Sequence, residues 1–169
     1  MNRTTVAAAL ATFACGLVAA PLVASHAATA PAAARAPAAN SAEVVRIRQA
    51  GLKEMGTAFK NVMDGLRGGE PQTILIQQSA RTIKNDAVAL RGWFPAGSGP
   101  QPGLKTSAKP EIWTKPAEFR AAQDGLVRAA ETFQGAAMSG NVDAMRAAAR
   151  GLGGACKTCH DQFRVPDQH

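Results

Sequence analysis

The residues best suited to chemistry stand near the C-terminus, where residues 156–160 read Cys-Lys-Thr-Cys-His. Two cysteines three positions apart share one face of a helix, so both sulfurs can reach the same edge of a flat cofactor. The C-x-x-C-H arrangement attaches haem through two thioether bonds, and the histidine then coordinates the iron. The motif therefore predicts one haem c held by Cys156 and Cys159, with His160 as the iron ligand.

Two other kinds of site use closely spaced cysteines. A thioredoxin-type pair belongs at the junction of a strand and a helix, and the chain shows no strand pattern. A structural zinc site needs four ligands, and the Cys and His residues after residue 27 are only Cys156, Cys159, His160 and His169. Neither context suits the motif, so haem is the favoured interpretation.

The first 27 residues have the three parts of a secretory signal peptide. Arg3 supplies a basic start, residues 6–23 supply an apolar segment, and residues 25–27 (Ser-His-Ala) form a small-x-small cleavage site. A retained membrane anchor is the alternative, but Pro21 and many alanines leave the segment weakly hydrophobic. We therefore expect export to the periplasm and no stable membrane insertion after cleavage.

Cleavage after residue 27 would leave a short leader and one domain. Cys15 lies inside the apolar segment, which argues against a lipoprotein. Residues 28–41 are rich in Ala and Pro and have no hydrophobic period, so we expect a flexible leader there. Residues 42–169 are long enough for a single domain, and they carry the haem motif.

Composition favours a helical protein without a nucleic-acid partner. Nineteen Lys and Arg against twelve Asp and Glu give a formal net charge of +7, and loss of Arg3 with the signal peptide leaves +6. The basic residues are spread singly, whereas a nucleic-acid footprint gathers them on one face. The chain is 46% apolar, has no Tyr and shows no alternation of apolar with polar residues, so we predict an all-α fold.

The spacing of apolar residues predicts two helices in the first half of the chain. The first begins at Ala42 and ends at Gly68-Gly69, and its inward seam steps by three and four residues. The second runs from Pro71 to Gly92. The residues predicted to line the seams are Val45, Arg48, Leu52, Met55, Phe59, Val62 and Leu66, then Ile76, Ala80, Ile83, Ala87 and Leu90.

Two more helices follow a long connection, residues 93–115, whose Gly and Pro content predicts no helix but whose Trp, Phe and Ile residues predict buried anchors. The third helix runs from Pro116 to Gly140, and the fourth from its N-cap Asn141 to Pro166. Their predicted seams hold Phe119, Leu126 and Phe133, then Val142, Met145, Ala149, Leu152, Cys156, Cys159 and Phe163. Together the elements predict an antiparallel four-helix bundle with a covalent haem near the C-terminus.

This combination resembles the cytochromes c′, an exported class II family of c-type cytochromes, over about residues 42–165. The resemblance rests on three matches. They are Arg48-Gln49 followed by Leu52, the segment 109–113 (Lys-Pro-Glu-Ile-Trp), and the haem motif followed by Arg164. The resemblance implies the four-helix bundle and the covalent haem c.

The resemblance also implies an open iron site. In the family, the residue three positions after the Arg-Gln pair faces the distal side of the iron, and here that residue is Leu52. A leucine has no lone pair to offer, so we expect five-coordinate, high-spin iron with His160 as its only protein ligand. Met55 is the alternative sixth ligand, although a methionine on a helix seam usually fills the core.

Four further positions carry over from the family. The resemblance implies that Arg48 and Gln49 meet the haem propionates and that Arg164 lies in the proximal pocket. The alternative for each arginine is a solvated surface charge. Trp113 is expected to anchor the long connection beside the haem.

Two functions from different classes follow from these expectations. The first is binding of diatomic gases, nitric oxide before carbon monoxide, as a carrier, scavenger or sensor. The second is one-electron transfer, with the basic surface steering the protein to an acidic redox partner. Leu52 favours gas binding over electron transfer. An open iron site must gain or rearrange ligands when its electron count changes, and this rearrangement slows electron transfer.

Two expectations concern catalysis and assembly. No second histidine is placed as an acid or base, so we predict no catalytic residues and no enzyme. The first two helices are expected to form a homodimer, because Val44, Ile47, Ile74 and Leu75 flank their inward seams and leave apolar surface for a partner.

Overall fold

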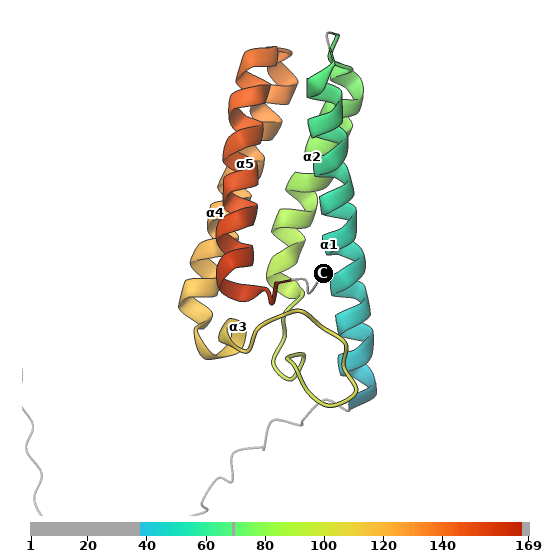
Figure 1. Cartoon of the computed structure of the whole chain (residues 1–169), viewed down its shortest axis with the longest axis vertical. Coiled ribbons are helices and arrows are strands. Elements are labelled where there is room, and N and C mark those ends of the chain that lie inside the picture. The colour runs from blue at the N-terminus through green and yellow to red at the C-terminus, as the bar shows by residue number, and fades with distance from the viewer. Residues whose placement is uncertain (1–37, 69, 167–169) are drawn as a thin grey trace, which may run out of the picture. The chain divides into compact units, whose positions relative to one another are not determined.

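The computed structural model describes residues 38–68 and 70–166. The predicted signal peptide and residues 28–37 of the predicted leader lie outside this range, and so does His169. Within it, four long helices run in alternating directions (Figure 1). They are α1 (Ala38–Arg67), α2 (Thr73–Ala89), α4 (Pro116–Ser139) and α5 (Val142–Phe163). The predicted antiparallel four-helix bundle is confirmed.

Two helix ends differ from the predicted boundaries. The first helix starts at Ala38, four residues before the predicted start at Ala42. The second starts at Thr73, and its last turn continues as a 3₁₀ helix, η1 (Leu90–Gly92). Helix termini shift easily by one or two residues, so the second difference is small.

The other two helices begin as predicted. Pro116 occupies the first turn of α4, where its missing N–H costs nothing. The Asn141 side chain caps α5 by accepting a hydrogen bond from the Ala144 N–H at 2.9 Å. Between them Gly140 has a φ of 71°, a left-handed conformation that glycine adopts without strain and that ends α4.

The connection between α2 and α4 contains one helical turn that the sequence did not predict. This turn is α3 (Glu111–Thr114), which follows Pro110 directly. The prediction that residues 93–115 hold no helix is therefore wrong at this point, because a proline before a helix is compatible with helical geometry. Ile112 of α3 is buried with Phe119 and Phe163, so the connection is anchored as expected.

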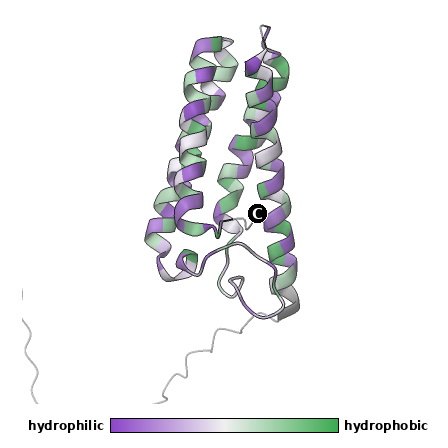
Figure 2. Ribbon diagram, viewed as in Figure 1, coloured by the Kyte–Doolittle hydropathy of each residue, from purple (hydrophilic) through white to green (hydrophobic). Residues whose placement is uncertain are grey.

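The core follows the predicted seams closely. The helices are amphipathic, with hydrophobic and hydrophilic residues interspersed along each of them (Figure 2). The predicted residues that are buried in α2, η1 and α4 are Ile76, Ala80, Ile83, Ala87, Leu90, Phe119, Leu126 and Phe133. No helix in the described part of the chain is both long and apolar enough to span a membrane.

The four long helices do not contact one another equally. Contacts are extensive between α1 and α2, between α2 and α4, and between α4 and α5, but few between α1 and α5. The bundle is therefore open along the side where α1 faces α5.

Candidate haem site

A cavity of about 480 Å³ lies between α1 and α5. Its lining also includes α2 and α4 residues, and residues 106–108 of the long connection. The volume falls within the range of roughly 300 to 1,000 Å³ that is typical of cofactor and ligand sites. The shape of the bundle thus leaves room for a bound group on the side where the helices contact least.

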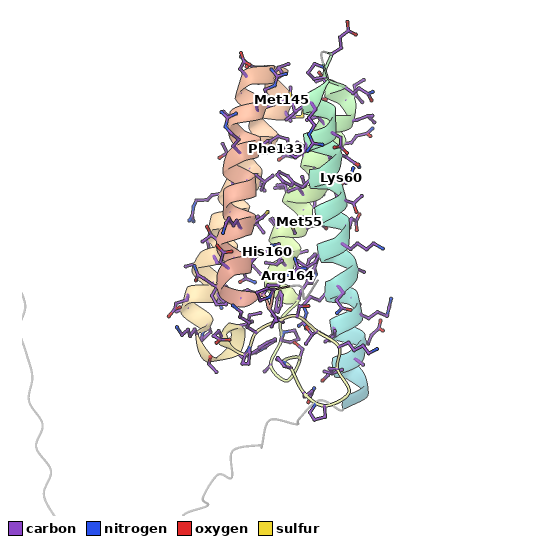
Figure 3. All side chains as sticks on the ribbon, in the orientation of Figure 1. Met55, Lys60, Phe133, Met145, His160 and Arg164 are labelled. Atoms are coloured by element: carbon purple, nitrogen blue, oxygen red, sulfur yellow. The ribbon has the colours of Figure 1, made fainter. Side chains whose placement is uncertain are left out.

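The α5 wall of the cavity carries the motif that predicts haem. Cys156, Cys159 and His160 all line the cavity, because three and four residues make about one helical turn. His160 and Arg164 lie toward the end of α5 that is nearest the long connection (Figure 3). No disulfide joins the two cysteines.

Burial sets the chemistry of the two thiols. It raises the pKa of Cys159 to about 11, with a further contribution from Cys156, and it also raises the pKa of Cys156. Both side chains are therefore neutral thiols at physiological pH, which suits placement against an apolar group.

Within the described residues, no three His, Cys, Asp or Glu side chains are grouped to hold a metal ion.

The cavity explains why four of the predicted seam residues are not fully buried. Leu52 is 38% exposed, although Val45, Arg48 and Met55 on the same seam are buried. Phe59, Cys156 and Cys159 are only half-buried. All four of these incompletely buried seam residues line the cavity. The two seams thus face a slot with apolar walls and attachment sulfurs on one side, which fits a covalently bound haem.

The α1 wall of the cavity includes the side chain of Leu52, which cannot coordinate a metal. Gly56 follows Leu52 one turn later on the same face. Met55 also lines the cavity, but it is 7% exposed and packs in the main core cluster. Leu52 thus lines the cavity from the wall across from α5.

The placement of Arg48 rules out one of its two sequence interpretations. It is 1% exposed, so it is not a solvated surface charge. Its guanidinium donates hydrogen bonds to the long connection, namely to the Ser98 carbonyl at 3.2 Å and to Thr106 Oγ1 at 3.0 Å. Burial lowers its pKa. Arg48 lines the cavity, but its hydrogen bonds are made to protein oxygens.

Of the other positions that the family resemblance implies, two line the cavity and one does not. Gln49 lines the cavity and donates through Nε2 to the Lys105 carbonyl at 2.9 Å. Arg164 lines the cavity next to the last turn of α5. Trp113 is not among the cavity-lining residues; its Nε1 donates to the Pro95 carbonyl at 3.0 Å and its ring packs on Phe94, which does line the cavity. Trp113 therefore anchors the connection but does not border the cavity.

Sequence reasoning missed one polar residue in the cavity wall. Gln123 of α4 is 5% exposed and lines the cavity, and its Nε2 donates to the Leu90 carbonyl at 3.2 Å. The signal was available, because Gln123 falls between Phe119 and Leu126 on the predicted seam of the third helix. A glutamine at such a position indicates a polar contact inside the bundle.

Comparison with known proteins agrees with the fold and with a covalently attached haem. The sequence model of the family described as Cytochrome C′ matches residues 43–164. A cytochrome c′ from Rhodopseudomonas palustris is 35% identical over 124 residues, which are 73% of this chain and 82% of that protein.

Two solved structures are also similar, each at 26% identity over 75% of this chain and 97% of the other. One is a nitric oxide complex of a variant cytochrome c′ from Alcaligenes xylosoxidans, with a TM-score of 0.68. The other is a cytochrome c′ with an unusual ligand-controlled dimer dissociation, with a TM-score of 0.70.

Proposed function

The chain belongs to the cytochrome c′ family, and from that membership we propose that it is an exported, periplasmic haem protein that binds diatomic gases, nitric oxide first. Like its family, it carries one covalently attached haem c, for which Cys156 and Cys159 are the attachment sulfurs. When bound, the haem supplies the iron to which a gas can bind. The residues of the chain determine which side of that iron is open.

One observation carries the proposal, namely the placement of Leu52 on the wall opposite His160. His160 provides an imidazole nitrogen from α5, whereas Leu52 provides only a hydrocarbon from α1. An iron with a ligand from one wall only keeps a position for an external ligand. The nitric oxide complex known for a similar protein supports nitric oxide as that ligand.

The same wall predicts which gases bind well. Leu52, at the position expected to face the iron, has no side-chain hydrogen-bond donor, and neither have Met55, Gly56 and Phe59. The donors of Arg48 and Gln49 on the same wall are directed to the long connection, and Lys53 also lines the cavity. Bound dioxygen draws negative charge and depends on such a donor, whereas nitric oxide and carbon monoxide depend on it much less. We therefore expect nitric oxide binding, weaker carbon monoxide binding because Leu52 must move, and no stable oxygen complex.

The test is an absorption titration of the purified holoprotein. Ferric and ferrous spectra are recorded without ligand, then with nitric oxide, carbon monoxide and air. Saturation at one nitric oxide per haem supports gas binding. A ferrous spectrum that does not change with nitric oxide contradicts it. Consumption of many nitric oxide molecules per haem would contradict our further proposal that the protein is not an enzyme.

A second function, one-electron transfer, is favoured by the charges around the cavity. The charged side chains among its lining residues are Arg48, Lys53 and Arg164, all basic, and none of these lining residues is Asp or Glu. Arg48 is buried, so Lys53 and Arg164 are the exposed basic residues that would steer the protein to an acidic redox partner. Rapid electron exchange with an acidic carrier that slows steeply with added salt would support this function over gas binding.

Assembly as a homodimer completes the proposal. Ile74 is 71% exposed, Leu75 is 54% exposed and Ile47 is 48% exposed, all on α1 or α2, while Val44 is half-buried. Exposed apolar side chains on two adjacent helices suit a symmetric contact with a second copy. The dimer known for a similar cytochrome c′ supports this assembly.

A further inference from the structure

A segment of the long connection forms hydrogen bonds with both walls of the cavity. We name residues 105–109 (Lys-Thr-Ser-Ala-Lys) the strap. In Figure 1 this yellow segment runs across the lower ends of α1 and α5. Thr106, Ser107 and Ala108 of the strap line the cavity. Direct contacts between α1 and α5 are few, and they include a hydrogen bond from Arg146 to the Leu66 carbonyl. The strap adds a second link between the two helices, at the end of the cavity that holds the haem motif.

The strap is paired with the end of α5 that follows the haem motif. The Val165 N–H donates to the Ser107 carbonyl at 2.8 Å, and the Lys109 N–H donates to the Phe163 carbonyl at 2.9 Å. Lys109 Nζ also donates to the Asp161 carbonyl at 3.0 Å. These bonds fix the strap to Asp161, Phe163 and Val165, which follow His160 directly in the chain.

The other side of the strap is fixed to α1 by two adjacent residues. Gln49 binds the Lys105 carbonyl, and Arg48 binds Thr106 Oγ1 at 3.0 Å. Thr106 Oγ1 in turn accepts a hydrogen bond from the Ala108 N–H at 3.2 Å. The Arg48–Thr106 contact is therefore one of the hydrogen bonds through which the strap links α1 to α5.

Arg48 is held more firmly than a typical arginine. Its guanidinium carbon lies 4.6 Å from the ring centre of Phe94, and its nitrogens donate to Ser98 and to the Trp93 carbonyl as well as to Thr106. The acceptors are neutral oxygens, so the buried cation is compensated by several hydrogen bonds together. Loss of one acceptor should loosen the whole contact.

We propose that Arg48 is a positioning residue that holds the strap against α1 and thereby fixes the spacing between Leu52 and His160. This inference rests on the proposed function, since the spacing matters because a gas must fit beside Leu52. In this role Arg48 acts through its hydrogen bond to Thr106. A role in binding the haem propionates would not involve Thr106.

That difference allows a double-mutant test in the holoprotein. Thr106→Val removes the acceptor without touching Arg48, Thr106→Ser keeps it, and Arg48→Lys removes the planar guanidinium. Arg46→Lys is the matched control, because Arg46 lies on the same helix but is exposed and paired with Glu43. Hydrogen exchange of the peptide containing Val165 reports on the strap, and the carbon monoxide association rate reports on the distal space.

We expect Thr106→Val and Arg48→Lys each to speed exchange at Val165 about tenfold, the effect of losing one hydrogen bond to a charged group. Carbon monoxide association should rise roughly three- to tenfold in both, because a looser strap lets Leu52 move aside more easily. The double variant should match Arg48→Lys, since Arg48→Lys already removes the contact with Thr106. Thr106→Ser and Arg46→Lys should retain slow exchange.

Three results would overturn the inference. A rate change in Arg48→Lys without one in Thr106→Val would mean that Arg48 acts on the cofactor directly. Faster exchange without a change in rate would mean that the strap does not set the distal spacing. Unchanged exchange in Thr106→Val would mean that the contact does not hold the strap. If the unaltered protein binds no gas, the proposed function fails, while the exchange measurement still decides whether Arg48 holds the strap.

Discussion

Leu52 of α1 and His160 of α5 line one cavity from opposite walls. The first offers a hydrocarbon surface and the second an imidazole that can coordinate iron. This pairing gives the two faces of a haem placed between them different chemistry. The predictions below test the pairing and the structural features that maintain it.

Substitution of Leu52 should change gas access before it changes stability. Leu52→Ala should raise the carbon monoxide association rate about tenfold, the factor for removing about 1.4 kcal/mol of steric barrier. Leu52→Met should slow binding of both gases by offering a sulfur to the iron. Stopped-flow mixing of the ferrous protein measures both effects.

Leu66→Ala is the matched control on the same helix. Leu66 is 6% exposed and does not line the cavity, so its truncation should cost about 2 to 5 kcal/mol of unfolding free energy without altering the rate. An unchanged association rate in Leu52→Ala would show that Leu52 does not limit access, and the assignment of the α1 wall would then be wrong.

Gly51 should tolerate no side chain, because the Trp93 ring packs against it. A Cβ at Gly51 would lie 2.3 Å from Trp93 Cη2, far inside contact distance. Gly51→Ala should therefore destabilise the protein by about 1 to 3 kcal/mol in urea unfolding. Gly135→Ala on α4 is the control, since nothing lies within 4 Å of its Cβ position. It should stabilise the helix by about 0.5 to 1 kcal/mol. Equal effects at the two glycines would contradict this packing.

The haem-free protein should lose stability at high pH. The pKa of Cys159 is raised by burial to about 11, so the folded state favours the protonated thiol. The corresponding stabilisation is complete below the ordinary thiol pKa of about 9, and it is lost as the pH rises from about 9 toward 11. Urea unfolding across this range measures the loss.

The holoprotein provides the control for this pH effect, because a thioether sulfur does not titrate. Its stability should not show the same decline between pH 9 and 11. Equal declines in the two forms would mean that Cys159 is not the group responsible. Acid-acetone extraction of the same holoprotein should leave the haem attached, as two thioether bonds require.

Charge on the exposed α2 surface should dissociate the dimer. Ile74→Asp places a carboxylate where a second copy is proposed to pack, so sedimentation at micromolar concentration should change from dimer to monomer. Met138→Asp is the control, because Met138 is 51% exposed but belongs to α4. A monomer for the unaltered protein would remove the dimer without affecting the haem site.

The helices and most of the core could be predicted from the sequence, because burial in a bundle repeats every three or four residues. The same periodicity could not show that Leu52 and Cys156 lie on the seam without being buried. Their exposure depends on how far α1 and α5 stand apart, which is a property of the whole bundle. The one-turn helix α3 was missed because its four residues are too few for a periodic pattern.

The role of Arg48 illustrates a second limit. Its position on the first seam was predicted, and its burial follows from that position. Its partners Ser98 and Thr106 lie 50 and 58 residues away, in a connection without regular structure. No local pattern identifies such partners, so the hydrogen bonds of Arg48 to the long connection could not be predicted from the sequence.

The central claim is that the iron has one protein ligand and one open position, and the resting ferric spectrum tests it most directly. The measurement compares the unaltered holoprotein with Met55→Leu, because Met55 is the residue of the α1 wall with a soft donor atom. Our account predicts a five-coordinate, high-spin spectrum that is the same in both proteins. A six-coordinate, low-spin spectrum that becomes high-spin only in Met55→Leu would show that Met55 fills the site, and would contradict the account.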